Sequence, residues 1–154
     1  SVTKGWTSYT VDSLEGFKNL LCMFSDMFAK KEAQYNLDIG CTLQSALLEY
    51  VALQTHGIKI ETIYEVHATP RDSDEPLYDW VAYKLSNGVM YAPFMLITRN
   101  DELLRKYKPS IMAHIAMTRF AKLEGCRKVD YGHFYNYKNF LKFETEYVKG
   151  LEKK

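Results

Sequence analysis

The chain has 154 residues, of which 47% are hydrophobic and 25% charged, as in an ordinary globular protein. This length predicts one domain, over residues 1–154, with enough core to fold without a disulfide or a metal. The net charge of +1 argues against a protein that coats nucleic acid over a broad surface. Three cysteines without metal spacing, no leader and no apolar run of about 18 residues predict a cytoplasmic protein with reduced thiols and no membrane span.

Two helices are predicted in the first third of the chain, after ten residues that show no clear period. The first spans residues 13–33, where apolar side chains recur at steps of three and four, and Asp12 and Glu15 have the spacing of a capping box before it. The second spans residues 42–54 and ends before Gly57.

Three strands follow. Residues 58–67 alternate between apolar and polar side chains, which predicts a half-buried strand. Residues 78–86 and 89–98 form a hairpin, because the Asn87-Gly88 pair between them favours a type I′ turn. Pro93 lies inside the second of these strands and cannot donate to a ladder, so it indicates an edge, a bulge or a splayed pairing.

A third helix is predicted over residues 109–123, with Pro109 in its first turn and Gly125 just beyond its end. Residues 127–131 read as a short strand, and residues 134–143 as a last helix. The predicted order is α-α-β-β-β-α-β-α, which places the chain in the α+β class.

Residues 121–132 read AKLEGCRKVDYG. This string is similar to the A-x-x-x-G-x-x-x-x-D-x-G of several branches of the GNAT-like N-acyltransferase superfamily, and the segment from 99 to 146 resembles the second half of that fold. Those branches include the cell-wall bridge peptidyltransferases and the aminoacyl-tRNA–protein transferases. The following YKNFLKF, at 137–143, looks like their Y-K-x-x-x-G-F ending. The resemblance implies a mixed, mostly antiparallel sheet flanked by helices in three layers, α-β-α.

The resemblance also implies an acyl donor. Its acyl arm would lie in a V beside Pro93, along Phe94, Met95 and Leu96, and its phosphates would meet the start of the central helix. Many relatives have a glycine-rich loop at that place, whereas this chain has Arg105-Lys106-Tyr107-Lys108-Pro109-Ser110. Arg105, Lys108 and Ser110 could hold the phosphates of acyl-CoA or the end of an aminoacyl-tRNA, or they could form a solvated turn. Tyr135 and Lys138 are further donor-binding candidates.

Tyr137 matches the tyrosine that protonates the leaving group in many of these enzymes, although a packed core tyrosine is the alternative. Asp130 and His133 could form an orienting pair beside the cleft, or a helix cap and a loop histidine. His67, with Glu65 on the same strand face, could be a base at a cleft mouth, and His114 reads better as a core histidine. No His, Asp, Glu or Cys set has metal spacing.

The acceptor implied by the resemblance is an amine. One related group, the phage-encoded Mom DNA-modifying enzymes, acts on nucleobases, so a nucleic-acid acceptor is one alternative. The other is a binding module that keeps the scaffold without catalysis, since the chain lacks both the glycine loop and a glutamate on the strand at 89–98.

Overall fold

The computed structural model describes residues 2–35 and 39–131 of the chain. Its order of elements is β-α-α-α-β-β-β-α-α-β. The elements are β1 (Val2–Thr10), α1 (Leu14–Met23), α2 (Ser25–Tyr35), α3 (Ile39–Thr55), β2 (Ile60–Pro70), β3 (Tyr78–Leu85), β4 (Val89–Ile97), α4 (Asp101–Tyr107), α5 (Pro109–Leu123) and β5 (Lys128–Asp130). The predicted last helix at 134–143 lies outside the described residues.

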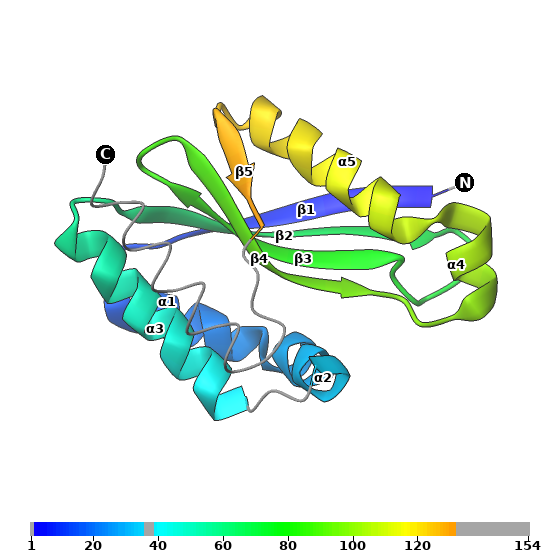
Figure 1. Ribbon diagram of the computed structural model, residues 1–154, viewed down its shortest axis with the longest axis horizontal. Coiled ribbons are helices and arrows are strands. Elements are labelled where there is room, and N and C mark those ends of the chain that lie inside the picture. The colour runs from blue at the N-terminus through cyan, green and yellow to red at the C-terminus, as the bar shows by residue number, and fades with distance from the viewer. Residues whose placement is uncertain (1, 36–38, 132–154) are drawn as a thin grey trace.

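The five strands form one open, mixed sheet in the order β1-β2-β3-β4-β5. The first four strands are antiparallel neighbours, and β5 pairs with β4 in parallel. Helices α1, α2 and α3 cover one face of the sheet and α5 covers the other (Figure 1). The predicted α+β class and the mostly antiparallel sheet between helices are therefore confirmed.

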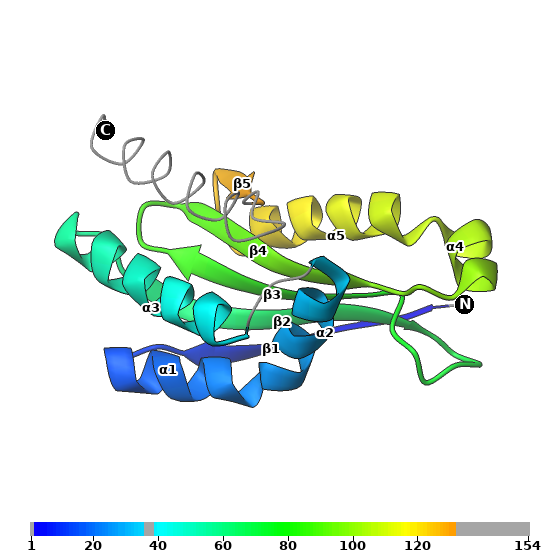
Figure 2. The same ribbon diagram turned by 60° about the horizontal axis from the view of Figure 1, so that its bottom comes forward.

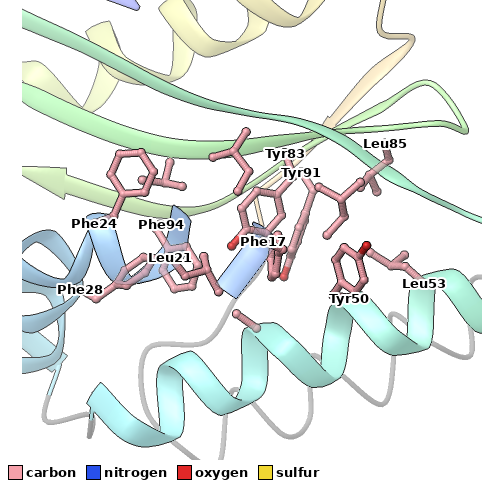
Figure 3. Packing of buried hydrophobic residues seen from close by; sticks show 14 of the residues in the cluster. Phe17, Leu21, Phe24, Phe28, Tyr50, Leu53, Tyr83, Leu85, Tyr91 and Phe94 are labelled. Atoms are coloured by element: carbon pink, nitrogen blue, oxygen red, sulfur yellow. The ribbon is translucent and has the colours of Figure 1, made fainter. Parts of the chain in front are cut away.

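Each face of the sheet packs its own hydrophobic core. The core under α1, α2 and α3 is rich in aromatic rings, and the Phe17 ring lies tilted at 4.9 Å from Tyr50 and edge-on at 5.4 Å from Tyr83 (Figure 3). On the opposite face Trp80, Met90, Met117 and Phe120 lie in the second core, beneath α5. Figure 2 shows how α5 runs along one side of the sheet while α1 and α3 run along the other.

The predicted helix at 13–33 is two helices in the structure. Phe24 ends α1 with a backbone φ of −93° and ψ of 15°, and its N–H bonds to the carbonyl of Leu21. The break keeps Phe24, Met27 and Phe28 in the core while the chain changes direction. The N-cap is Ser13 rather than Asp12, since the Ser13 hydroxyl accepts from the Gly16 N–H at 3.0 Å.

The sequence missed the first strand. β1 is an edge strand whose side chains are mostly exposed on both faces, so it has no apolar period for a pattern to detect. It is held by nine register pairs with β2, from Val2 with Pro70 to Thr10 with Thr62. Long-range strand pairing of this kind cannot be predicted from local sequence patterns.

The hairpin at Asn87-Gly88 is present, but its turn is not type I′. Gly88 alone has a positive φ, of 84°, and its N–H bonds to the Leu85 carbonyl at 3.1 Å. This is a three-residue loop in which a tight turn is followed by a left-handed glycine. The Asn87 carboxamide oxygen completes it by accepting from the Val89 N–H at 3.2 Å.

Candidate functional site

Strands β4 and β5 are paired over only a short distance. Their parallel register joins Val89 with Lys128, Met90 with Val129 and Tyr91 with Asp130, and then β5 ends while β4 continues to Ile97. Immediately past Tyr91 the register of β4 with β3 shifts by one, so that Ala92 and Pro93 together stand opposite one residue of β3. The bulge predicted as one reading of Pro93 is thus confirmed.

The three residues after the bulge have different surroundings. Phe94 is buried and stacks on Phe28 with ring centroids 4.4 Å apart, so its side chain belongs to the core. Met95 packs against the core under α5, and its carbonyl accepts a hydrogen bond from the Lys31 ammonium at 3.4 Å. Leu96 is half-buried and lines a cavity. Of the three donor-arm candidates, only Leu96 presents its side chain to a cavity.

The basic segment before the central helix includes a short helix that the sequence did not predict. Asn100 caps α4 by accepting from the Glu102 and Leu103 N–H groups at 3.0 and 3.2 Å. Lys108 then joins α4 to α5 in a left-handed conformation, with a φ of 48°. None of the described side chains caps the start of α5, where Ser110 lies in the first turn. Arg105 is exposed in the last turn of α4.

A buried polar cluster lies beside the short β4–β5 ladder. The Tyr91 hydroxyl donates to the Glu49 carboxylate at 3.2 Å, and both side chains are buried. Burial, followed by the charges of Glu49 and Asp130, holds the pKa of Tyr91 well above its usual range. Burial and Glu49 do the same to the pKa of Tyr83. Asp130, a predicted site residue, therefore contributes to the electrostatic environment of this cluster.

A cavity of about 400 Å³ opens at the far end of β4, on the face covered by α2. Its polar lining comes from Lys30 on α2, Glu75 before β3, Asp79 on β3, and Thr98 and Arg99 after β4, and its apolar lining from Ala33, Pro76, Leu96 and Ile97. The Thr98 hydroxyl donates to the Glu75 carboxylate at 2.7 Å.

Asp79 is the functional candidate that sequence reasoning missed. Burial, and then the neighbouring Glu65 carboxyl to which it is hydrogen-bonded, raise the pKa of Asp79 to about 8, against a smaller opposing effect of Lys30. The pair therefore retains one proton at neutral pH. The clue in the sequence was a single acid in the otherwise apolar start of a strand, between Tyr78 and Trp80.

His114 and His67 have different surroundings. The His114 ring lies 5.6 Å from Trp80 and 4.8 Å from Tyr131, and its Nδ1 is 2.7 Å from the Ser110 carbonyl, so it is a half-buried, hydrogen-bonded histidine rather than a fully buried core residue. His67 lies over Gly5, where a methyl group would come within 3.1 Å of the imidazole ring, and it also lines the hollow beside α5. His133, Tyr135, Tyr137 and Lys138 lie outside the described residues.

A second hollow, of about 670 Å³, lies between α5 and the edge formed by β1 and β2. Its cations are Lys4, Lys108 and Arg119, and none of the described residues that line it is acidic. Trp6 and Ile111 line it as well and are 56% and 61% exposed. This groove combines positive charge with exposed apolar surface.

Within residues 2–35 and 39–131, no group of three or more His, Cys, Asp or Glu side chains is arranged to hold a metal ion. No helix in the same part of the chain combines the length and apolar composition that crossing a bilayer requires. No protein-family model, no curated protein and no solved structure matches the chain.

Proposed function

We propose that this protein is an acyltransferase that moves an acyl or aminoacyl group from a phosphate-bearing donor to an amine. The observation that carries the proposal is the way β5 leaves β4. The parallel ladder ends at Tyr91 and Asp130, β4 bulges at Pro93, and the strand then runs on past its neighbour. Such a parting provides main-chain groups along which an extended acyl arm can lie, as in GNAT-like enzymes.

The donor phosphates would bind at the start of α5. Helix N-termini favour anions, because their first N–H groups lack partners within the helix and their dipoles add positive potential. Lys108 and Ser110 lie at this start, and Arg105 lies just before it, in the last turn of α4. Since no glycine loop is present, an aminoacyl-tRNA end is as suitable a donor as acyl-CoA.

The chemistry needs few groups. The amine nitrogen attacks the acyl carbon and loses a proton to a base or to water, the bond from that carbon to the donor's sulfur or oxygen breaks, and the leaving group takes a proton. In this proposal Tyr137 supplies that proton, while Asp130 and His133 orient the cleft. Main-chain N–H groups and the positioning of the two substrates provide most of the acceleration.

A second candidate is a nucleic-acid acceptor, as in the DNA-modifying branch. The groove beside α5 favours it, because its described lining has three cations and no acidic residue, and these cations with the exposed Trp6 suit a phosphate backbone and a stacked base. A binding module without catalysis is the third candidate. It predicts that no donor is turned over.

Thermal-shift measurements with acetyl-CoA, CoA and an aminoacyl-tRNA mimic test the donor. A donor at 100 times its dissociation constant is expected to stabilise the protein by about 2.7 kcal/mol. Lys108→Asn removes the cation while keeping a residue that tolerates a positive φ, and is expected to weaken the donor roughly tenfold. Lys122→Asn, in the last turn of the same helix, is the matched control and keeps full affinity.

Turnover then separates catalysis from binding. Tyr137→Phe is expected to lower the rate of acyl transfer tenfold or more, within about the range of general acid catalysis, without weakening donor binding. Absence of a shift with every donor would contradict the acyltransferase proposal. A donor that binds without turnover would identify the binding module, and retardation of DNA that weakens steeply with salt would favour the nucleic-acid acceptor.

A further inference from the structure

The cavity at the end of β4 brings both signs of charge into one small volume. Asp79 contributes a carboxyl group from β3, and Lys30 and Arg99 contribute cations from α2 and from the chain after β4. Leu96 and Ala33 add apolar surface between them. About 400 Å³ is enough for a molecule the size of an amino acid.

The charged groups of this cavity have different surroundings. The Asp79 carboxyl is hydrogen-bonded to Glu65, but its buried Oδ1 atom has no hydrogen-bond partner among the described residues. Lys30 and Arg99 are exposed, and within the described part of the chain neither forms an ion pair. Glu75, by contrast, is engaged by the Thr98 hydroxyl. A buried polar atom without a partner costs roughly 1 to 3 kcal/mol, so its presence in a cavity calls for a ligand.

We propose that this cavity binds a free α-amino acid with an apolar side chain. The ammonium group lies against the Asp79–Glu65 carboxyl pair, the carboxylate lies against Arg99 and Lys30, and the side chain packs on Leu96. Opposite charges on the ligand match opposite charges in the wall, which a simple amine or a simple acid would leave half unpaired.

The position of the cavity also gives this ligand a role, which rests on the proposed function. It opens on β4 beyond the bulge, at the end of the strand along which the acyl arm would lie. The bound ammonium would pass one proton to the carboxylate that remains in the half-protonated pair and become a neutral amine. That nitrogen then forms the new bond to the acyl carbon as the bond to the donor breaks. The second proton that the nitrogen loses as the amide forms passes, through water, to balance the proton taken up by the leaving group.

Binding is tested without any donor, by titrating the full chain with L-leucine and following backbone amide resonances. Two analogues are the controls: 3-methylbutylamine lacks the carboxylate and 4-methylpentanoate lacks the amine. L-leucine is expected to bind at least tenfold more tightly than either, with shifts at Asp79, Leu96 and Arg99. Equal affinities for all three ligands, no binding below about 10 mM, or shifts elsewhere would overturn the proposal.

Two substitutions assign the ends of the ligand. Arg99→Gln is expected to lower the affinity for L-leucine and 4-methylpentanoate roughly tenfold and to leave 3-methylbutylamine unchanged. Asp79→Asn is expected to weaken the two amines and spare the acid. Arg71→Gln, in the neighbouring loop but outside the cavity, is the control. The ligand comparison on the unmodified protein decides the matter even if one variant does not fold.

The two proposals fail separately. Amino-acid binding with no donor binding would leave the cavity assignment standing and remove the acyltransferase. Donor binding and turnover with no amino-acid binding would support the acyltransferase proposal and contradict the cavity assignment. The groove beside α5 would then be the candidate site for the acceptor.

Discussion

Asp79 is an unusual residue for its position, because it lies in β3 between Tyr78 and Trp80, which are 1% and 2% exposed. A carboxylate there loses hydration, and the nearby Glu65 adds repulsion, so the folded protein prefers Asp79 protonated. Glu65 on β2 and Lys30 on α2 are the charged groups that act on its pKa. His67 lies opposite it in the register of β2 and β3, and Glu75 and Arg99 line the same cavity. Carboxyl groups with a strongly raised pKa cluster at functional sites, so the burial of Asp79 indicates a functional role.

The free-energy cost of burying the Asp79 carboxylate increases as pH rises. The pKa of Asp79 is about 8 in the folded protein against an ordinary value of 3.8, so between these values the folded chain binds a proton that the unfolded chain does not. Stability therefore falls as pH rises from about 4 to 8. Asp79→Asn, which cannot ionise, is expected to raise Tm by roughly 2 to 8 °C at pH 9, for about 1 to 2 kcal/mol, and little at pH 4.

Thermal denaturation of both proteins across this pH range measures the effect. Asp72→Asn serves as the control, since Asp72 is exposed in the loop after β2, and it is expected to leave the pH profile unchanged. A gain in Tm for Asp79→Asn that is the same at pH 4 and pH 9 would show that Asp79 is not the titrating group.

The helices and strands of this fold differ in how far local sequence features determine them. α5, β2, β3 and β4 were predicted within a few residues of their observed bounds, because an apolar period, Pro109 and Gly88 are all local features. β1 and α4 were not predicted. β1 depends on pairing with residues about sixty positions away, and α4 is a two-turn helix with no buried side chain.

The hairpin between β3 and β4 was predicted correctly from Asn87-Gly88, but the type I′ geometry predicted for its turn was wrong. Gly88 alone carries the positive φ, and a methyl group added there would meet only Arg127, at an ordinary contact distance of 3.5 Å. Gly88→Ala is therefore expected to cost about 1 to 2 kcal/mol through backbone strain rather than a clash. Gly88→Asn, which tolerates this conformation better, is expected to cost less.

Urea denaturation of the two variants measures this difference as a change in midpoint at constant slope. Equal losses for Ala and Asn would contradict strain as the cause and would indicate instead that the space beside Arg127 is limiting.

At the scale of the whole molecule, one sheet supports two separate cores. Ile63 and Val66 are three residues apart on β2, yet Ile63 packs under α1, α2 and α3 and Val66 under α5. The two cores share the backbone of this sheet. The donor and acceptor sites proposed above rest on this shared framework.

If the two cores unfold as one unit, damage to each should lower the same free energy. Ile63→Val is expected to cost about 0.5 to 1.5 kcal/mol and Val66→Ala about 1 to 3 kcal/mol. The double variant is expected to lose their sum to within about 0.5 kcal/mol, since the side chains lie on opposite faces. Chemical denaturation measures all three, and a second transition or a reduced slope in either single variant would contradict a single cooperative unit.

The candidate site could be predicted only in part. Short sequence motifs predicted the strand with Pro93, the basic start of α5 and Asp130, because the residues of each motif are neighbours in the chain. The cavity could not be found, since Lys30, Asp79 and Arg99 come from three separate segments and meet only through the sheet register and the packing of α2. Phe94 is apolar and lies on β4, the strand predicted to contact the acyl arm. Its ring packs against Phe28 in the aromatic core, and this contact could not be predicted from the sequence either.

The bulge in β4 has a further consequence for how copies of this protein meet. Strands at the border of a sheet are templates for another chain, and proteins guard them with proline, irregular register and lysine. Past its described pairing with β5, β4 has the first two, since Pro93 lacks a donor and the bulge interrupts the ladder, and Lys31 of α2 bonds to the Met95 carbonyl of β4. The strand proposed to guide a ligand is therefore a poor template for aggregation.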